Sequence, residues 1–338
     1  MYKRLKARSP AKLILSGEHA VLYGAPAIAL AIDRYAYSTV LSALSSSILF
    51  NCLNLKYARS LTRQTLKVIT QRIQEQYRDF LEGRCGIREV LKKPFELVQY
   101  TVMHILESLN ISLLQGLEIR SASSIPIGCG LGSSAAVIMS TLYAVAHFFG
   151  LELDASGFVS LGRVSENLQH GQSSGLDLHV AMLGGCLHFQ AGKVSTRIMP
   201  QVPMMIVQTG TPMVTTGECV RAVEPYFQTG SMIDDFAAVT QAFDEALSLQ
   251  AQQSMQACIR ENHRLLVKIG VVPLKVQQLI QALEKSGAAA KICGAGSIAG
   301  DRAGVVLVLA DQDISHIVTQ YGYGMQPVRV DTQGTCLV

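Results

Sequence analysis

A glycine-rich loop followed at once by a long apolar run constrains this chain more than any other feature. The stretch IPIGCGLGSSAAVIMS at 125–140 places glycine at positions 128, 130 and 132. Glycine adopts positive φ readily, and its lack of a side chain lets backbone N–H groups approach a ligand closely. A helix beginning near Ser133 would aim its unpaired N–H groups at the same point, which favours binding of an anion such as phosphate.

Three interpretations of this loop compete. A Walker A loop requires a lysine directly before the serine pair, and this chain has Gly132 there. A dinucleotide fingerprint requires glycine where Ser133 stands. A tight strand-to-helix turn without a ligand stays open, although Ser133 and Ser134 place two hydroxyls where a Mg²⁺ ion or a phosphate oxygen would sit.

Length, charge and cysteine spacing argue against several classes of protein. At 338 residues the chain exceeds a usual single core, so we expect two domains that share a cleft, divided near 190–202 where turn formers gather. A net charge of +4 with scattered basic residues argues against nucleic-acid binding. Eight widely spaced cysteines indicate reduced thiols in a cytoplasmic protein and disfavour zinc. The apolar stretch 135–149 is too short for a membrane span.

Hydrophobic periodicity predicts a chain of mixed helices and strands. Asp154 fits the N-cap of a helix that runs to about His170, and we expect the connector 81–93 to be exposed. Other expected helices cover 60–80, 94–109, 133–149, 234–249, 252–269 and 273–286. Expected strands cover 12–17, 27–33, 35–44, 116–123, 184–190 and 203–210.

Four motifs, spread in order along the chain, resemble those of one kinase superfamily. They are SPAKLILSGEHAVLYG (9–24), IPIGCGLGSSAA (125–136), ENLQHGQSSGLD (166–177) and KICGAGS (291–297). Together they look like the motifs of the kinases that comprise galactokinase, homoserine kinase, mevalonate kinase and phosphomevalonate kinase, the GHMP superfamily. Within it, GEHAVLYG is most similar to the mevalonate kinase branch.

The resemblance implies an α+β fold of two domains. The N-terminal domain, 1–195, would have a ribosomal protein S5 domain 2-like fold, and the C-terminal domain, 196–338, a ferredoxin-like fold, with ATP and substrate between them. The implied activity is transfer of a phosphoryl group from ATP, with Mg²⁺, to the primary (C5) hydroxyl of mevalonate in isoprenoid precursor synthesis. A cytoplasmic enzyme that takes a small-molecule substrate, and that can form a homodimer, is expected.

The same resemblance assigns residues to the nucleotide and the metal. Ser134 and Glu166 would bind Mg²⁺, because hard oxygen ligands suit that ion. Without the resemblance, Glu166 would be interpreted as a solvated carboxylate at a helix end. The residues implied to bind ATP are Pro126, Gly128, Gly130, Leu131, Gly132, Ser133, Ser134 and Ala135.

Catalysis and acceptor binding are assigned by the same match. Asp177 would accept the proton of the attacking hydroxyl or hold that hydroxyl in line, and Lys12 beside it would steady negative charge on the moving phosphoryl group. The acceptor pocket would contain Lys12, Glu18, His19, Asp177, Thr215, Gly294 and Ala295, with His19 near the substrate carboxylate. Thr216 is an equal alternative to Thr215. We expect the other histidines, at 104, 147, 170, 179, 188 and 263, to have ordinary core or surface roles.

Two departures from the superfamily matter. The catalytic aspartate is generally followed by Asn and the glycine before it is preceded by Pro, whereas this chain has Leu178 and Ser174. The usual run GAGGGG is replaced by GAGSIAGDRAG at 294–304, where Arg302 either contacts an acidic group or lies on a longer surface turn.

Other functions stay open at this stage. The same machinery acting on phosphomevalonate or a sugar is one, and a non-catalytic nucleotide-binding relative is another. A dinucleotide-dependent oxidoreductase is a third, although GAGSIAG is followed by GVVLVLA, which predicts a strand where a fingerprint requires a helix.

Overall fold

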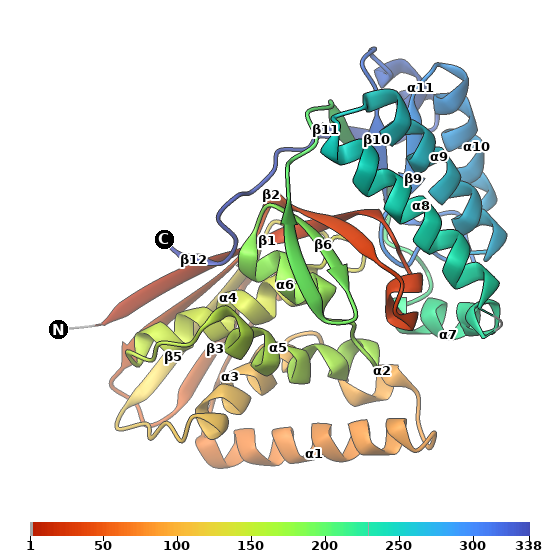
Figure 1. Cartoon of the computed structure of the whole chain (residues 1–338). Coiled ribbons are helices and arrows are strands. Elements are labelled where there is room, and N and C mark those ends of the chain that lie inside the picture. The colour runs from red at the N-terminus through yellow and green to blue at the C-terminus, as the bar shows by residue number, and fades with distance from the viewer. Residues whose placement is uncertain (1–2, 229) are drawn as a thin grey trace.

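The computed structural model describes residues 3–228 and 230–338 and contains two β-sheets with helices packed on them (Figure 1). The larger sheet has the strand order β12-β1-β2-β5-β3-β4, and a β6–β7 hairpin extends from β2. Its strands are β1 (Arg4–Ser16), β2 (Ala27–Ala43), β3 (Ile48–Cys52), β4 (Tyr57–Leu61), β5 (Gly116–Ser123), β6 (Cys186–Gln190), β7 (Lys193–Arg197) and β12 (Cys336–Leu337). The α+β class predicted from the sequence is confirmed.

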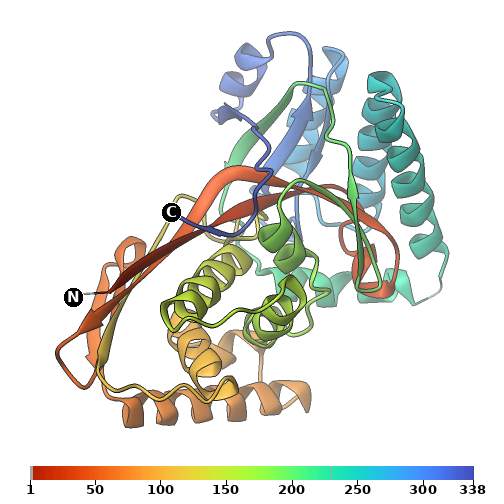
Figure 2. The ribbon, with the colours of Figure 1, turned by 60° about the vertical axis from the view of Figure 1, so that its left-hand side comes forward.

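The helices that cover the larger sheet form layers beneath it (Figures 1 and 2). Helix α4 contacts β1 and β2, α3 and α5 flank α4, and α1 packs on α3. Their bounds are α1 (Arg63–Leu81), α2 (Ile87–Val90), α3 (Glu96–Ser108), α4 (Ser133–Phe148), α5 (Ala155–His170) and α6 (Leu176–Leu183). The predicted N-cap of α5 is confirmed, because the Asp154 carboxylate accepts a hydrogen bond from the N–H of Gly157 at 2.8 Å.

The smaller sheet is antiparallel, with the order β11-β8-β10-β9, and its helices pack beside it. Its strands are β8 (Met204–Gly210), β9 (Ala289–Ile292), β10 (Gly304–Leu309) and β11 (Gly324–Pro327). The helices of this part are α7 (Thr216–Phe227), α8 (Ser231–Ser248), α9 (Gln252–Lys268), α10 (Leu274–Lys285) and α11 (Ser315–Gln320). Two short 3₁₀ helices, η1 (Ala20–Tyr23) and η2 (Leu53–Leu55), belong to the first part of the chain.

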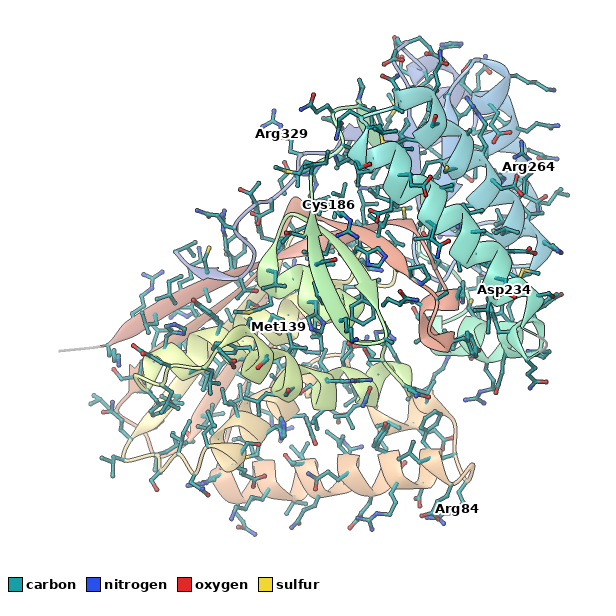
Figure 3. All side chains as sticks on the ribbon, viewed as in Figure 1. Arg84, Met139, Cys186, Asp234, Arg264 and Arg329 are labelled. Carbon is teal, nitrogen blue, oxygen red and sulfur yellow. The ribbon has the colours of Figure 1, made fainter. Side chains whose placement is uncertain are left out.

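One hydrophobic core joins the two sheets. Leu13 and Leu30 of the larger sheet pack in one buried cluster with Phe243 of α8, Ile259 of α9 and Leu307 of β10. Burial of apolar surface is the main favourable contribution to such packing, so this cluster fixes the relative position of the two parts. Figure 3 labels two interior side chains, Met139 and Cys186. It also labels two exposed side chains, Arg84 and Arg264, for contrast.

The last residues of the chain return to the larger sheet. Strand β12 pairs with β1, and an isolated bridge joins Ile32 to Val330. Asp331 fastens this return, because its carboxylate accepts hydrogen bonds from the Tyr35 hydroxyl at 2.8 Å and the Gly334 N–H at 2.7 Å. The start of β1 and the C-terminal end of the chain therefore lie at the same end of the larger sheet (Figure 1).

One prediction of local structure is wrong and another is incomplete. The expected separate strands at 27–33 and 35–44 form one continuous strand, because a register shift between Pro10 and Ala11 of β1 accommodates the charged pair Asp33 and Arg34 as a bulge. The connector at 81–93 is largely exposed, as expected, but it contains the short helix α2, which is partly buried. Ile87 and Val90 of α2 lie three positions apart and pack on Tyr100 and Leu168.

Across the described ranges, none of the helices combines the length and apolar character needed to cross a bilayer.

Candidate active site

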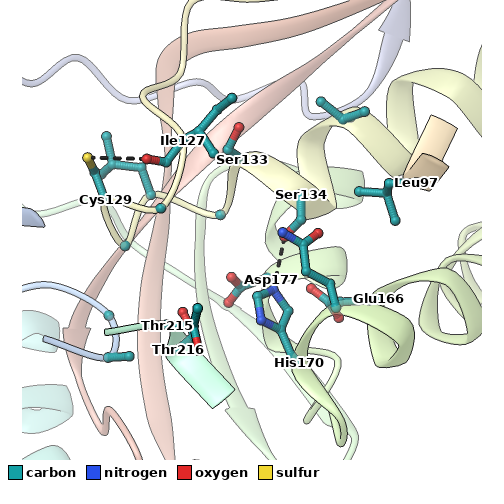
Figure 4. Close-up of a pocket in the computed structure, with 18 of the residues that line it drawn as sticks. Leu97, Ile127, Cys129, Ser133, Ser134, Glu166, His170, Asp177, Thr215 and Thr216 are labelled. Carbon is teal, nitrogen blue, oxygen red and sulfur yellow. Dashed lines mark hydrogen bonds between the residues drawn. The ribbon is translucent and has the colours of Figure 1, made fainter. Parts of the chain in front are cut away.

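A cavity of about 630 Å³ lies where four parts of the chain meet. They are the glycine loop, the C-terminal end of α5, the N-terminal end of α6 and the segment before α7. Its volume is in the range of small-molecule sites. The loop 128–134 forms one wall, and Glu166, His170 and Asp177 come from elements beyond it. Figure 4 shows Ser134, Glu166, His170 and Asp177 gathered around the same part of the cavity.

The glycine loop is fixed by close backbone packing as well as being open to the cavity. Gly128, Gly130 and Gly132 have φ of 71°, 83° and 67°. A Cβ on Gly130 would lie 2.1 Å from the carbonyl oxygen of Cys293, and one on Gly132 would lie 2.7 Å from Cγ of Lys12. Both positions therefore require glycine for the packing of the protein itself, in addition to any ligand.

Helix α4 begins at Ser133, as the sequence predicts. Its N-cap is Gly132, which has no side chain to accept hydrogen bonds from the first N–H groups. The partial positive charge of the helix N-terminus thus faces the cavity. Six of the predicted nucleotide residues line the cavity: Gly128, Gly130, Leu131, Gly132, Ser133 and Ser134. Pro126 and Ala135 lie outside the lining, and Ala135 is buried in the packing of α4.

The structure brings Lys12 and Asp177 together across the loop. Lys12 Nζ lies 3.2 Å from Asp177 Oδ1, and the Lys12 N–H donates to the carbonyl of Leu131 at 3.0 Å. Lys12 is buried, whereas the Asp177 side chain is 27% exposed at the cavity. Asp177 stands in the first turn of α6, where the helix dipole favours a negative charge. A buried ammonium is thus paired with a carboxylate that a ligand can reach.

Glu166 is not the solvated helix-end carboxylate that its sequence context alone would suggest. It is 2% exposed and accepts a hydrogen bond from the Ser173 hydroxyl. Burial, with the nearby negative charge of Asp177, raises the pKa of Glu166 to about 8. Burial therefore favours the neutral form of this carboxyl, and a metal cation bound beside it would oppose that effect.

His170 is a site residue that the sequence reasoning missed. Its Nε2 and the Ser134 hydroxyl are hydrogen-bonded at 3.1 Å, shown as a dashed line in Figure 4. Burial lowers the pKa of His170, so the ring is neutral near pH 7. A usable signal was its position four residues after Glu166, which places both side chains on one face of α5.

Glu18 lies in the cavity wall but is bound to a residue far away in the sequence. Its carboxylate forms an ion pair with Lys291, and neither side chain is exposed. Burial raises the pKa of Glu18, and the Lys291 charge opposes that rise. The sequence did not lead us to expect a role for Lys291, although this lysine is the first residue of the motif KICGAGS.

His19 lines the same wall in an uncharged state. Its Nε2 lies 3.1 Å from the Ala295 carbonyl, and burial lowers the pKa of the ring to about 4. A carbonyl only accepts, so Nε2 carries the proton and Nδ1 is left as an acceptor. The contact of His19 with a substrate carboxylate stays a prediction. Among the described residues, the buried Nδ1 of the neutral ring has no hydrogen-bond partner, so it could also accept from a hydroxyl.

Thr215 and Thr216 both line the cavity at the start of α7. The Thr215 hydroxyl is the N-cap: it accepts from the Glu218 N–H at 3.3 Å and donates to the Glu218 carboxylate at 2.8 Å. Glu218 in turn accepts from Arg88 of α2 at 2.6 Å. These contacts fasten α7 to α2 at the cavity. Because both threonines line the cavity, both stay candidates for contact with the acceptor.

The second glycine loop supplies backbone to the cavity, and its extension points elsewhere. Gly294 packs on Gly130, and Gly294 and Ala295 line the cavity. Asp301 and Arg302 are exposed and lie outside the lining, which supports the longer surface turn. The chain then enters β10, as the sequence predicts, where a dinucleotide fingerprint would need a helix.

Basic side chains at the mouth of the cavity form a further group that the sequence reasoning missed. They are Arg88, Lys92 and Lys93, from the segment expected to be an exposed connector. Arg88 is paired with Glu218, whereas the charges of Lys92 and Lys93 add positive potential that attracts anionic ligands.

Comparison with known proteins agrees with this geometry. The family model described as the GHMP kinases N terminal domain matches residues 96–185. The mevalonate kinase of Pyrococcus horikoshii is 32% identical over 310 residues, which cover 88% of this chain and 87% of that protein. The mevalonate kinase of Thermococcus onnurineus is 31% identical over 328 residues, covering 94% and 92%.

Solved structures share the whole fold. The Methanococcus jannaschii mevalonate kinase has a TM-score of 0.78 at 24% identity and covers 98% of each chain. The Lactococcus lactis galactokinase complexed with galactose has a TM-score of 0.77 at 16% identity. Fold and matched domain together define a GHMP kinase, so the predicted superfamily is confirmed and the oxidoreductase alternative is wrong. By its sequence similarity the chain belongs to the mevalonate kinase family.

Proposed function

We propose that this chain transfers the terminal phosphoryl group of ATP to the primary (C5) hydroxyl of mevalonate, giving 5-phosphomevalonate for isoprenoid precursor synthesis. The observation that carries the proposal is the pair of Lys12 and Asp177, which packs directly against Gly132 of the glycine loop and lines the same cavity. Phosphoryl transfer requires mainly positioning and stabilisation of charge, and this arrangement offers both. The family membership of the chain supports the choice of mevalonate.

The phosphates of ATP would bind the loop 128–134 and the N-terminus of α4. Backbone N–H groups and the helix dipole stabilise phosphate at such a site. Ser133 and Ser134 add hydroxyl donors. Lys92 and Lys93 at the mouth would guide the anionic nucleotide inward.

Ser134 and Glu166 would hold Mg²⁺. In the described part of the chain, no three or more His, Cys, Asp or Glu side chains gather into a ready-made metal site. That fits Mg²⁺, which is usually bound by one or two carboxylates together with substrate phosphates. The buried Glu166, with its pKa raised to about 8, suits a site where a cation keeps the carboxylate ionised. When bound, Mg²⁺ supplies neutralisation of charge on the phosphates.

Asp177 would orient the attacking hydroxyl and accept its proton at a carboxylate oxygen. Its exposure to the cavity makes that oxygen available, and its pairing with Lys12 fixes the side chain. The Lys12 ammonium would stabilise the negative charge that develops on the phosphoryl group.

The remaining acceptor contacts would come from the segment after β1, the second glycine loop and the start of α7. Glu18 and His19 both offer hydrogen-bond acceptors, which suit the hydroxyl groups of an alcohol. Gly294 and Ala295 would line the pocket through their backbone, and Thr215 or Thr216 would contact the acceptor from α7. A division into domains 1–195 and 196–338, a homodimer and a cytoplasmic location stay predictions.

The test is ADP release by the purified chain with ATP and Mg²⁺ over a panel of acceptors. The panel contains mevalonate, phosphomevalonate, galactose and homoserine. We expect release above background with mevalonate and much less with the others. Activity on a sugar with none on mevalonate would replace the proposed acceptor, and no stimulation by any acceptor would contradict a small-alcohol kinase.

A further inference from the structure

Lys291 is a fully buried ammonium with all its hydrogen bonds made. Its side chain has an exposed fraction of 0%, and it stands on β9 of the smaller sheet. Its Nζ donates to the Glu18 carboxylate, to the Ile14 carbonyl at 3.0 Å and to the Ile292 carbonyl at 3.0 Å. An ammonium has three donors, and these three acceptors use them all. Such a group is fixed in place on every side.

These contacts join the two sheets directly behind the cavity. Ile14 lies on β1 of the larger sheet and Glu18 follows that strand, whereas Lys291 and Ile292 lie on β9. Glu18 lines the cavity, and Lys291 lies behind it, outside the lining. Lys291 can therefore affect a ligand only through Glu18 or through the backbone around it.

The second carboxylate oxygen of Glu18 is the informative atom. Among residues 3–228 and 230–338, Glu18 Oε2 is buried without a hydrogen-bond partner. His19 Nδ1 on the same wall is in the same state. Buried polar atoms normally have partners, and an unsatisfied one costs free energy. Two such acceptors in one cavity wall point to donors that arrive with a ligand.

We propose that Lys291 is a positioning residue for the acceptor alcohol: it holds the Glu18 carboxylate so that Oε2 accepts a hydrogen bond from a substrate hydroxyl. The inference rests on the proposed function only in that the cavity takes an alcohol. It does not depend on that alcohol being mevalonate.

A merely structural ion pair makes a different prediction. Removing one partner of a buried pair is strongly destabilising, because a charge is left unpaired. A purely structural Lys291 would therefore affect stability and the KM values of both substrates alike. A positioning role would affect the KM of the acceptor far more than the KM of ATP, and would depend on Glu18.

The experiment compares Lys291→Met, Glu18→Gln and the double variant, with Lys285→Met on the exposed end of α10 as the matched control. We expect Lys291→Met to raise the acceptor KM about tenfold or more, which corresponds to loss of one hydrogen bond to a charged group. The KM of ATP should stay within about twofold, and Lys285→Met should match the wild type. In the Glu18→Gln background, adding Lys291→Met should change the acceptor KM little, because coupled residues are not additive.

Equal changes in both KM values, or an effect of Lys291→Met that adds fully to that of Glu18→Gln, would overturn the inference. If Lys291→Met does not fold, Glu18→Gln decides alone, because an unchanged acceptor KM in that variant removes the role of Oε2. The acceptor used is whichever alcohol the wild type phosphorylates best. A wild type that phosphorylates none contradicts the proposed function itself, which keeps the two failures distinct.

Discussion

The two walls of the cavity are built in different ways. The wall at 128–134 is a short continuous segment that presents backbone N–H groups and the N-terminus of α4. A second wall, which packs against this loop, consists of side chains, in which Lys12 pairs with Asp177 and Glu18 with Lys291. A phosphate is a common anion that any correctly turned loop can bind. A particular alcohol needs individually placed donors and acceptors, and these come from distant parts of the chain.

The largest expected effect separates chemistry on the side-chain wall from binding on the backbone wall. Asp177→Asn keeps the shape of the residue but removes the charge that accepts the proton. We expect turnover to fall by about 10²- to 10⁴-fold, which is the usual contribution of a general base. Binding of ATP, measured by equilibrium titration, should stay within about threefold, because one isosteric change leaves a site largely intact.

Asp301→Asn, on the exposed turn outside the lining, is the control and should retain wild-type turnover. Near-normal turnover of Asp177→Asn would remove Asp177 from the mechanism. It would also contradict the assignment of chemistry to the side-chain wall and of ATP binding to the backbone wall.

The second prediction concerns the backbone wall. Gly130 and Gly150 both have positive φ, but a Cβ on Gly130 would lie 2.1 Å from a backbone oxygen, whereas one on Gly150 would meet open space. We expect Gly150→Ala to cost about 1 kcal/mol from backbone strain. Gly130→Ala should cost about 2 kcal/mol or more beyond that, because the clash is with backbone that must move. Denaturant unfolding measures both, and equal losses would show that the loop is not packed as described.

The third prediction uses the charge state of His19 on the side-chain wall. Burial lowers its pKa to about 4 in the folded state, below its ordinary value of 6.5. Between pH 6.5 and 4 the unfolded chain binds a proton that the folded chain does not, so His19 makes stability fall as the pH falls through this window. In this pH window, the free energy of unfolding of His19→Asn should fall less steeply with falling pH than that of the wild type. The difference in slope corresponds to the uptake of up to one proton on unfolding.

His316→Asn, an exposed position on α11, serves as the control for His19→Asn and should keep the wild-type slope. An unchanged slope in His19→Asn would mean that the His19 ring takes up its proton in the folded protein, as a ring facing a substrate carboxylate would.

The smallest predicted effect lies where the two walls meet, at the contact of His170 with Ser134. His170→Ala would free the Ser134 hydroxyl to rotate, so we expect the apparent affinity for Mg²⁺ to weaken by about tenfold, as for other residues that orient metal ligands. Mg²⁺ dependence of ADP release and Mg²⁺-dependent nucleotide binding both measure it. His316→Ala should leave the Mg²⁺ dependence unchanged, and an equally unchanged His170→Ala would exclude the positioning role.

The difference between the walls also decides how much the sequence predicts. The glycine loop, the start of α4 at Ser133 and the cap at Asp154 follow from local rules, because each depends on neighbours in the chain. The contact of Glu18 with Lys291 spans 273 positions, so it forms only through packing of two sheets whose meeting no local pattern encodes. The spacing of His170 from Glu166 could have identified His170 as a site residue from the sequence.

The α2 segment is a second case in which the sequence pattern does not predict the structure. Its polar composition suggests an exposed connector, but Ile87 and Val90 bury their side chains and hold Arg88 at the cavity. Four residues provide too short a periodic signal to identify a helix.

The central claim is that the cavity transfers phosphate to the primary hydroxyl of mevalonate, and the most direct test follows that phosphate. The wild type is incubated with ATP labelled in the terminal phosphate, Mg²⁺ and mevalonate, and the products are identified by ³¹P NMR and chromatography. We expect one labelled 5-phosphomevalonate for each ADP formed. Label in inorganic phosphate alone, or on another position of mevalonate, would contradict it.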